Sequence, residues 1–289
     1  MTKTVLGIIG GSGVYDIALD HAQWHSVASP WGEASDAVRQ GEIGGLAVVF
    51  LPRHGRGHVH SPSDINYRAN IDVLKRCGVT DLFSFSAVGS LKANVPPGTF
   101  VVPDQFIDKT YKRASSFFGT GCVAHVPFGE PTSSALRKLA VKALLAEQIE
   151  HISGGTLVTM EGPQFSTRAE SELHRRWGAS LIGMTAMPEA KLAREAELPF
   201  CNISMATDFD SWHPHHDAVD VAKVMAVMQS NVGLAKRFVL RLAALMPREH
   251  QPCAADTALD GAIMTAADKR DPLLMAKLDA ITQRVMTTR

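Results

Sequence analysis

The stretch Ile182–Asp210 reads I-G-M-T-A-M-P-E-A-K-L-A-R-E-A-E-L-P-F-C-N-I-S-M-A-T-D-F-D. An apolar run at 180–184 leads into it and is typical of a β-strand. Pro188 and Glu189 then open a helix, because proline favours the first helical turn and an acid there complements the helix dipole. A second apolar run follows at 200–206. The stretch is therefore predicted to be a strand–helix–strand unit.

Polar side chains stand at the ends of both predicted strands. Thr185 follows the first strand, and Asp208 and Asp210 follow the second. In parallel α/β sheets, ligands bind outside the carboxyl ends of the strands. Two carboxylates spaced i, i+2 at such an end can bind one small molecule together. Alone, the same acids are more typical of a solvent-facing loop, so the rest of the chain has to decide.

The composition excludes several classes of partner. The chain has 289 residues, 45% of them hydrophobic, which is ample for a buried core. Lys plus Arg and Asp plus Glu number 29 each, so bulk charge predicts neither nucleic-acid nor membrane binding. No continuous apolar run is long enough to span a membrane, and no signal peptide fits the start. Without metal-type or redox-type spacing, the cysteines indicate reduced thiols in a cytoplasmic protein: Cys77, Cys122, Cys201 and Cys253.

Strand and helix patterns alternate along most of the chain. Further strands are predicted at 4–9, 47–51, 81–87, 99–103 and 155–160, and helices at 64–76, 133–150, 167–177 and 217–246. The fold class is therefore α/β, a single domain over 1–246 with a mixed, mostly parallel central sheet flanked by helices. Residues 247–257 are a polar linker, so we expect 247–289 to be a helical extension packing on the body or on a neighbouring subunit.

Two further strand ends carry anion-binding features. Gly10–Gly13 is a glycine turn, but Asp16 excludes the dinucleotide-binding fingerprint, and no Gly-Lys-Ser/Thr follows as in a P-loop. Arg53 and His54 follow another strand and could supply fixed donors to an oxyanion. The histidine-rich run to His60 could instead bind a metal, but it lacks nearby carboxylates or thiolates. No metal site is expected.

Seven short motifs occur in one order along the chain. They are G-G-S-G at 10–13, R-H-G at 53–55, N-Y-R-A-N at 66–70, S-A-V-G-S at 86–90, E-G-P-Q-F-S-T-R-A-E at 161–170, M-T-A-M-P-E at 184–189 and A-T-D-F-D at 206–210. Each is weak alone. Together, over about residues 4–245, the chain resembles the trimeric purine nucleoside phosphorylase family, on the branch that acts on methylthioadenosine.

The resemblance implies phosphorolysis of a 5′-methylthio adenine nucleoside, without metal or cofactor and with inorganic phosphate as co-substrate. The products would be adenine and 5-methylthioribose 1-phosphate. The implied phosphate-binding residues are Ser12, Arg53, His54, Ser86, Ala87 (through its backbone N–H) and Thr185. The implied nucleoside-binding residues are Phe165, Ile182, Met184, Asp208, Asp210, Val221, Val224 and His125. The implied catalytic residues are Asp208, Asp210, His54 and Thr185.

Asp208 and Asp210 separate the implied activity from its alternatives. A 6-amino group donates hydrogen bonds, so acceptor carboxylates suit adenine better than a 6-oxopurine. The alternatives are a 6-oxopurine nucleoside or methylthioinosine phosphorylase, a hydrolase that needs no phosphate, and a non-catalytic module that senses a purine.

The loop 115–131 bears on the oligomeric state. It is long, apolar and aromatic for a solvated loop, so it suggests an interface, unless these side chains pack on their own subunit. The resemblance implies a homotrimer in which His125 of this loop reaches the neighbouring subunit's pocket.

Overall fold

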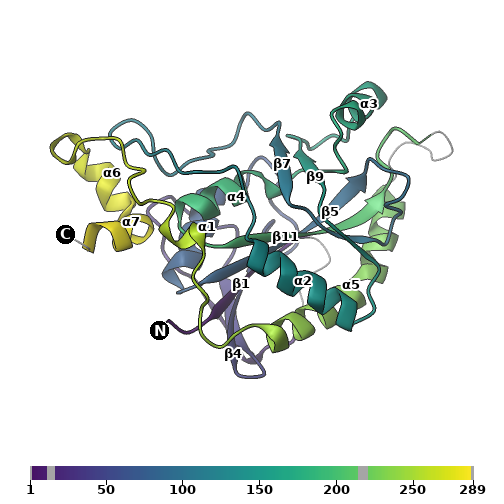
Figure 1. Ribbon diagram of the computed structural model, residues 1–289, viewed down its shortest axis with the longest axis horizontal. Helices are drawn as coiled ribbons and strands as arrows, with labels where there is room; N and C mark the ends of the chain where they lie inside the picture. Colours follow the sequence, from purple (N-terminus) through teal and green to yellow (C-terminus); the bar gives the residue numbers. More distant parts are fainter. Residues whose placement is uncertain (1, 12–16, 214–220, 288–289) are drawn as a thin grey trace.

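The strands form one branched, twisted sheet. The computed structural model describes residues 2–11, 17–213 and 221–287 (Figure 1). The strands are β1 (Val5–Gly10), β2 (Asp20–His25), β3 (Val38–Ile43), β4 (Leu46–Pro52), β5 (Asp81–Ser90), β6 (Phe100–Val102), β7 (Gln105–Asp108), β8 (His151–Ser153), β9 (Thr156–Thr159), β10 (Leu181–Gly183) and β11 (Phe200–Asp208). Their order is β2-β3-β4-β1-β5-β10-β9-β7, and β11 also pairs with β5 and leads to β6 and β8. The pairings β1–β4, β1–β5, β5–β11, β9–β10, β6–β8 and β7–β9 are parallel, whereas β2–β3, β3–β4, β5–β10 and β6–β11 are antiparallel. The predicted mixed, mostly parallel α/β sheet is confirmed.

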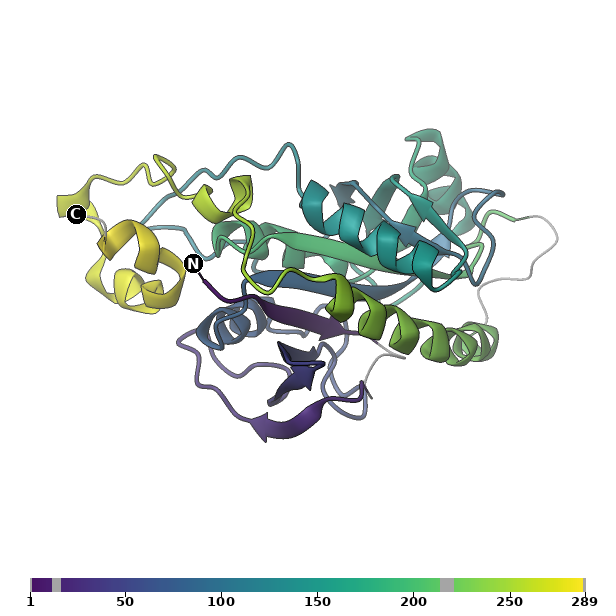
Figure 2. The same cartoon turned by 60° about the horizontal axis from the view of Figure 1, so that its bottom comes forward.

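The helices cover both faces of this sheet. They are α1 (Tyr67–Arg76), α2 (Ser134–Ala146), α3 (Arg168–Arg176), α4 (Ala186–Glu195), α5 (Val221–Leu245), α6 (Pro272–Lys277) and α7 (Asp279–Thr287). Helices α2 and α5 lie side by side on one face (Figures 1 and 2) and share a core with β5 and β11. Helices α1 and α4 contribute to a second core on the other face. No helix in the described residues is both long and apolar enough to cross a membrane.

The element boundaries differ from expectation where polar residues lie. Helix α1 begins three residues later than predicted because Asn66 caps it, accepting a hydrogen bond from the backbone of Ala69. Strands β2, β3, β7 and β8 were not predicted, since they are short or polar and show no apolar alternation. The capping box of Thr167 and Glu170 at the start of α3 is confirmed.

The segment after α5 packs against the α/β body at the end opposite to α3. Helices α6 and α7 lie at the left of Figure 1, near the amino terminus, and α3 lies at the right. Leu278 and Ile281 are buried in the core that α1 and α4 share. The loop 115–131 joins the same region, because the backbone of His125 bonds to Ala262.

This packing corrects the argument that the loop's aromatic residues suggest an interface. Phe117 and Phe118 are buried within their own chain, and Val126 and Phe128 pack against the same core. Val123 is exposed. The alternative, packing on the same subunit, therefore accounts for most of these side chains. His125 itself is exposed.

His250 ties the linker after α5 to the sheet and predicts a pH dependence of stability. Its ring nitrogens lie 2.9 Å from Asp81 and 2.8 Å from Asp256, and these carboxylates raise its pKa from 6.5 to about 10. A raised histidine pKa stabilises the fold below the unfolded value and is lost as pH rises toward the folded value. We expect the free energy of unfolding to fall by on the order of 1 kcal/mol from neutral pH to about pH 10. Denaturant titration should show this slope flattened in His250→Gln, and an unchanged slope would contradict the assignment.

Candidate active site

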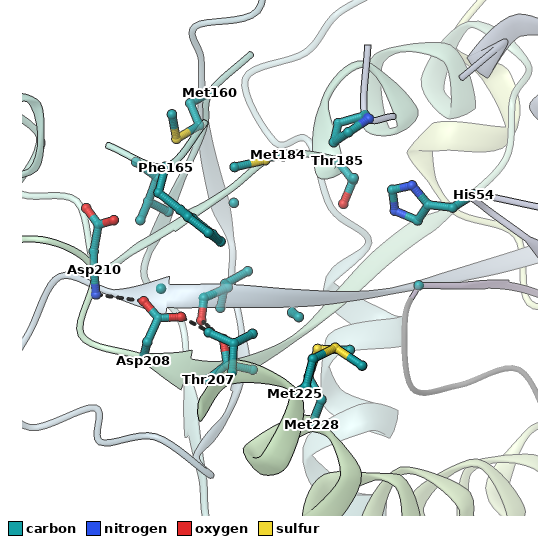
Figure 3. Close-up of a pocket in the computed structure, with 18 of the residues that line it drawn as sticks. His54, Met160, Phe165, Met184, Thr185, Thr207, Asp208, Asp210, Met225 and Met228 are labelled. Atoms are coloured by element: carbon teal, nitrogen blue, oxygen red, sulfur yellow. Dashed lines mark hydrogen bonds between the residues drawn. The ribbon is translucent and has the colours of Figure 1, made fainter. Parts of the chain in front are cut away.

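One cavity lies at the carboxyl ends of β1, β4, β5 and β11. Its volume is about 270 Å³, near the lower end of the range for small-molecule sites. Figure 3 shows Asp208 and Asp210 at one end and His54 and Thr185 at the other, with Phe165 and Met184 between them. These strands are parallel, so their carboxyl ends meet at one edge, and this is where the sheet rule places a ligand.

Most of the predicted site residues line this cavity. They are Arg53, His54, Ala87, Phe165, Ile182, Met184, Thr185, Asp208, Asp210 and Val224. Ser86 lies just beneath, 3% exposed, with its hydroxyl 3.3 Å from that of Thr185. His125 does not line the cavity of its own chain. Ser12 and the side chain of Val221 lie outside the described residues.

Arg53 is held in a buried ion pair. Its Nε lies 2.5 Å from Glu189 Oε1, and its Nη2 donates to Glu189 Oε2 and to the hydroxyl of Ser84. Its Nη1 donates to the carbonyl of Phe85 at 2.6 Å. Among the described residues that line the cavity, Arg53 is the only lysine or arginine, and the carboxylate of Glu189 offsets its charge.

His54 is a neutral hydrogen-bond acceptor toward any ligand. Its Nδ1 lies 2.9 Å from the carbonyl oxygen of His60, which can only accept, so Nδ1 carries the proton. Burial, with the charge of Arg53 adding to it, lowers the pKa of His54 from 6.5 to about 3. The ring also stacks on His58, with 4.1 Å between centroids. His54 therefore offers an unprotonated Nε2, not the donor expected from the sequence.

We expect His54 to stay neutral between about pH 5 and 8. The Cε1–H resonance, assigned by comparison with His54→Gln, should show no titration step across this range. The same residue in denaturant should titrate near its ordinary value of about 6.5. A step in the folded protein would contradict the lowered pKa of His54.

The two aspartates are fixed at the other end by the chain around them. Asp208 ends β11, and its two oxygens accept from the Thr207 hydroxyl at 2.8 Å and the Asp210 backbone at 2.7 Å. This turn puts Asp210 at φ 49°, a left-handed conformation that aspartate tolerates. Gly89 leaves room opposite, because a Cβ there would lie 3.0 Å from Asp208 Oδ1 and that carboxylate would have to shift.

Burial raises the pKa of both aspartates. Thr207 and the Asp210 backbone lower that of Asp208 in part, and the neighbouring carboxylate raises it further. Asp210 is 5% exposed, and its Oδ2 has no hydrogen-bond partner within the described structure. Two buried carboxyls that resist ionisation are suited to hold a proton, and the unpartnered Oδ2 of Asp210 is suited to receive a hydrogen-bond donor.

An apolar section separates the two ends. Met160, Phe165, Met184, Val224, Met225 and Met228 line it. Phe165 is 43% exposed, so its ring is accessible for stacking on a planar ligand. The cavity can hold a ligand with an anion at the His54 end, a sugar in the apolar section and a hydrogen-bonding heterocycle at the aspartate end.

The chain matches known proteins over almost its whole length. A model of the phosphorylase superfamily matches residues 5–244. The chain belongs to the phosphorylase superfamily. An S-methyl-5′-thioadenosine phosphorylase of Bradyrhizobium diazoefficiens is 59% identical over 99% of each chain. One from Cereibacter sphaeroides is 53% identical over 98% of this chain and 99% of its own.

Solved structures of the superfamily agree. A methylthioadenosine phosphorylase from an antarctic soil metagenomic library superposes with a TM-score of 0.91, at 40% identity, covering 97% of this chain and 99% of its own. A methylthioadenosine phosphorylase of Schistosoma mansoni in complex with adenine superposes with a TM-score of 0.85, at 33% identity, covering 90% and 99%. The predicted family is confirmed.

Arg113 and Glu161 form a buried ion pair beside the site, and this pair was not predicted from the sequence. Arg113 donates to the carbonyls of Met184 at 2.5 Å, Met187 at 2.7 Å and Glu161 at 2.8 Å. Arg113 therefore connects the chain segment around Glu161 with the segment 184–187, and both segments border the cavity. Burial would raise the pKa of Glu161, but hydrogen bonds from Ser63 and the backbone of 111–112, with the charge of Arg113, lower it to about 2. A single arginine just before the loop 115–131 carries no sequence pattern that would mark it.

Proposed function

We propose that the protein catalyses phosphorolysis of S-methyl-5′-thioadenosine, releasing adenine and 5-methylthioribose 1-phosphate, a pentosyl transfer of purine and methionine salvage. Full-length relatives named S-methyl-5′-thioadenosine phosphorylase support this, as do related structures that hold adenine. The single observation that carries the proposal is the pair of buried carboxylates, Asp208 and Asp210, in the cavity that also contains His54 and Thr185.

The chemistry follows from the two ends of the cavity. Phosphate accepts hydrogen bonds from Thr185, Ser86, the Ala87 backbone and Ser12, in the field of Arg53, and its own hydroxyl donates to Nε2 of His54. A phosphate oxygen attacks the anomeric carbon as the bond to the purine breaks. The transition state resembles an oxocarbenium ion, and charge moves to purine N7. Asp208, with its raised pKa, holds a proton or hydrogen bond at N7, and Asp210 accepts from the 6-amino group.

The sugar and its 5′ substituent occupy the apolar section. Met184 contacts the ribose, Ile182 lines the cavity beside it, and Phe165 stacks near the base. Val224, which lines the cavity, would contact the methylthio group, and the resemblance assigns Val221 to the same wall. The proposed reaction needs no metal or cofactor, because inorganic phosphate is the nucleophile.

The working unit in this proposal is a cytoplasmic homotrimer. His125 is exposed, its backbone bonds to the segment after α5, and it does not line its own cavity, which supports a role in a neighbouring subunit's site. This also puts the extension 247–289, which packs on its own body, next to the subunit boundary.

The decisive experiment measures adenine release from S-methyl-5′-thioadenosine with and without inorganic phosphate. We expect release that saturates in both substrates and stops without phosphate. Release without phosphate would indicate a hydrolase. Preference for inosine-type nucleosides would indicate a 6-oxopurine or methylthioinosine phosphorylase, and binding without turnover a purine sensor.

The shared site predicts complementation between two inactive variants. His125→Asp and Asp208→Ala, unfolded and refolded together, should regain activity because some mixed trimers contain a site with both native residues. Each variant refolded alone is the control, and light scattering should give a mass of three chains. A monomer, or no recovery despite mixed assembly, would remove His125 from the site and leave the phosphorolysis intact.

A further inference from the structure

A polar face shared by two strands continues from the cavity into the core. In the parallel pairing of β5 with β11, Asn202 lies opposite Ser84, and Ser204 opposite Ser86. Alternate residues of a strand share a face, so these four side chains face the same way. All are buried, at 3% exposure or less. The opposite face carries the apolar residues that pack against α2 and α5.

The orientation of the Asn202 amide follows from its neighbours. The Ser84 hydroxyl donates to Glu189 at 2.6 Å, so its oxygen can only accept from Asn202, 3.3 Å away. The amide nitrogen therefore faces the serines and also donates to Ser86 Oγ at 3.1 Å. On its other side Asn202 Oδ1 accepts from Ser204 at 2.7 Å.

The Ser86 hydroxyl therefore cannot donate a hydrogen bond to Asn202 on the core side. Its oxygen accepts a hydrogen bond from the Asn202 amide, and the Thr185 hydroxyl lies 3.3 Å away on the cavity side. The two hydroxyls hold two protons, of which one can serve the bond between them. The other is directed outward, toward the cavity that Thr185 lines.

We propose that Asn202 is a positioning residue that holds the Ser86–Thr185 hydroxyl pair with a donor aimed at phosphate; this rests on the proposed phosphorolysis. The donor matters because other sources of attraction are weak in this cavity. Glu189 offsets the charge of Arg53, and His54 accepts instead of donating. A hydrogen bond to a charged group contributes more than one between neutral groups, so its direction affects phosphate affinity.

The test compares Asn202→Asp and Asn202→Leu with Cys201→Ala. The aspartate keeps the size but replaces the donor with an acceptor, which draws the Ser86 proton inward, and the leucine removes the donor. We expect both to raise the KM for phosphate by about tenfold or more and to change the KM for nucleoside by less than about threefold. Cys201→Ala, a buried neighbour on the apolar face, should lower stability and leave both KM values unchanged.

A second readout needs no turnover. Inorganic phosphate alone should raise the Tm of the wild type by mass action, and Asn202→Asp should need about tenfold more phosphate for the same rise. The inference is overturned if both variants keep the wild-type phosphate response, if the two KM values rise in equal proportion, or if Cys201→Ala behaves like them. The two proposals can fail separately. If phosphate raises the Tm of the wild type more than that of Asn202→Asp, but the wild type does not cleave the nucleoside, the proposed function is overturned and the inference stands.

Discussion

Replacing Asp210 with asparagine is expected to lower kcat/KM for S-methyl-5′-thioadenosine by about 30-fold or more, equivalent to about 2 kcal/mol of transition-state stabilisation. The carboxylate that would accept from the 6-amino group becomes an amide, which can present a donor to that donor. The substitution should not disturb the fold, because asparagine has the same size and tolerates the left-handed conformation of φ 49°. The backbone bond to Asp208 does not involve the altered side chain.

The measurement compares amino and oxo substrates in the same variant. Methylthioinosine or inosine should lose less than the adenine nucleoside, because the amide can donate to a 6-oxo group. Ser211→Ala is the matched control: its hydroxyl bonds to the Ser166 carbonyl, next to the site, and it does not line the cavity. Equal losses for both substrate types would mean that Asp210 does not contact position 6 of the purine.

The strand-end residues could be predicted because their placement follows from local pattern and one rule of parallel sheets. The apolar runs before Arg53, Thr185 and Asp208 predict strands, and the sheet brings their carboxyl ends together. The resemblance then ordered these residues into a phosphate end and a purine end. This much needs no knowledge of long-range packing.

The supporting contacts could not be predicted because they join distant segments. Glu189 pairs with Arg53 across 136 residues, and Asn202 bonds to Ser86 across 116. A signal for Asn202 was present, since Phe-Ser-Phe-Ser at 83–86 alternates as a strand with one polar buried face would. The inference of an interface from the loop 115–131 failed for the same reason. Its aromatic residues look unpartnered in the sequence, but α4 and the extension after α5 help to cover them.

The Arg53–Glu189 pair changes the result expected from the simplest phosphate-site variant. Arg53→Ala would leave Glu189 buried, 1% exposed, without its cation. Losing one partner of a buried pair costs about 3–5 kcal/mol, so this variant should unfold at a much lower denaturant concentration. A loss of activity in it would not identify a phosphate ligand, because the fold itself is weakened.

The double variant Arg53→Met, Glu189→Leu separates the two roles. Replacing both charges with apolar side chains should restore much of the lost stability, since no uncompensated buried charge remains. If the field of Arg53 contributes to phosphate binding, the KM for phosphate should stay raised by about tenfold or more in the stable double variant, with the KM for nucleoside close to that of the wild type. Urea denaturation and phosphate saturation curves on the wild type, both single variants and the double variant complete the cycle. A double variant that regains both stability and the wild-type KM for phosphate would show that Arg53 only supports the fold, and that hydroxyl and backbone donors bind the anion.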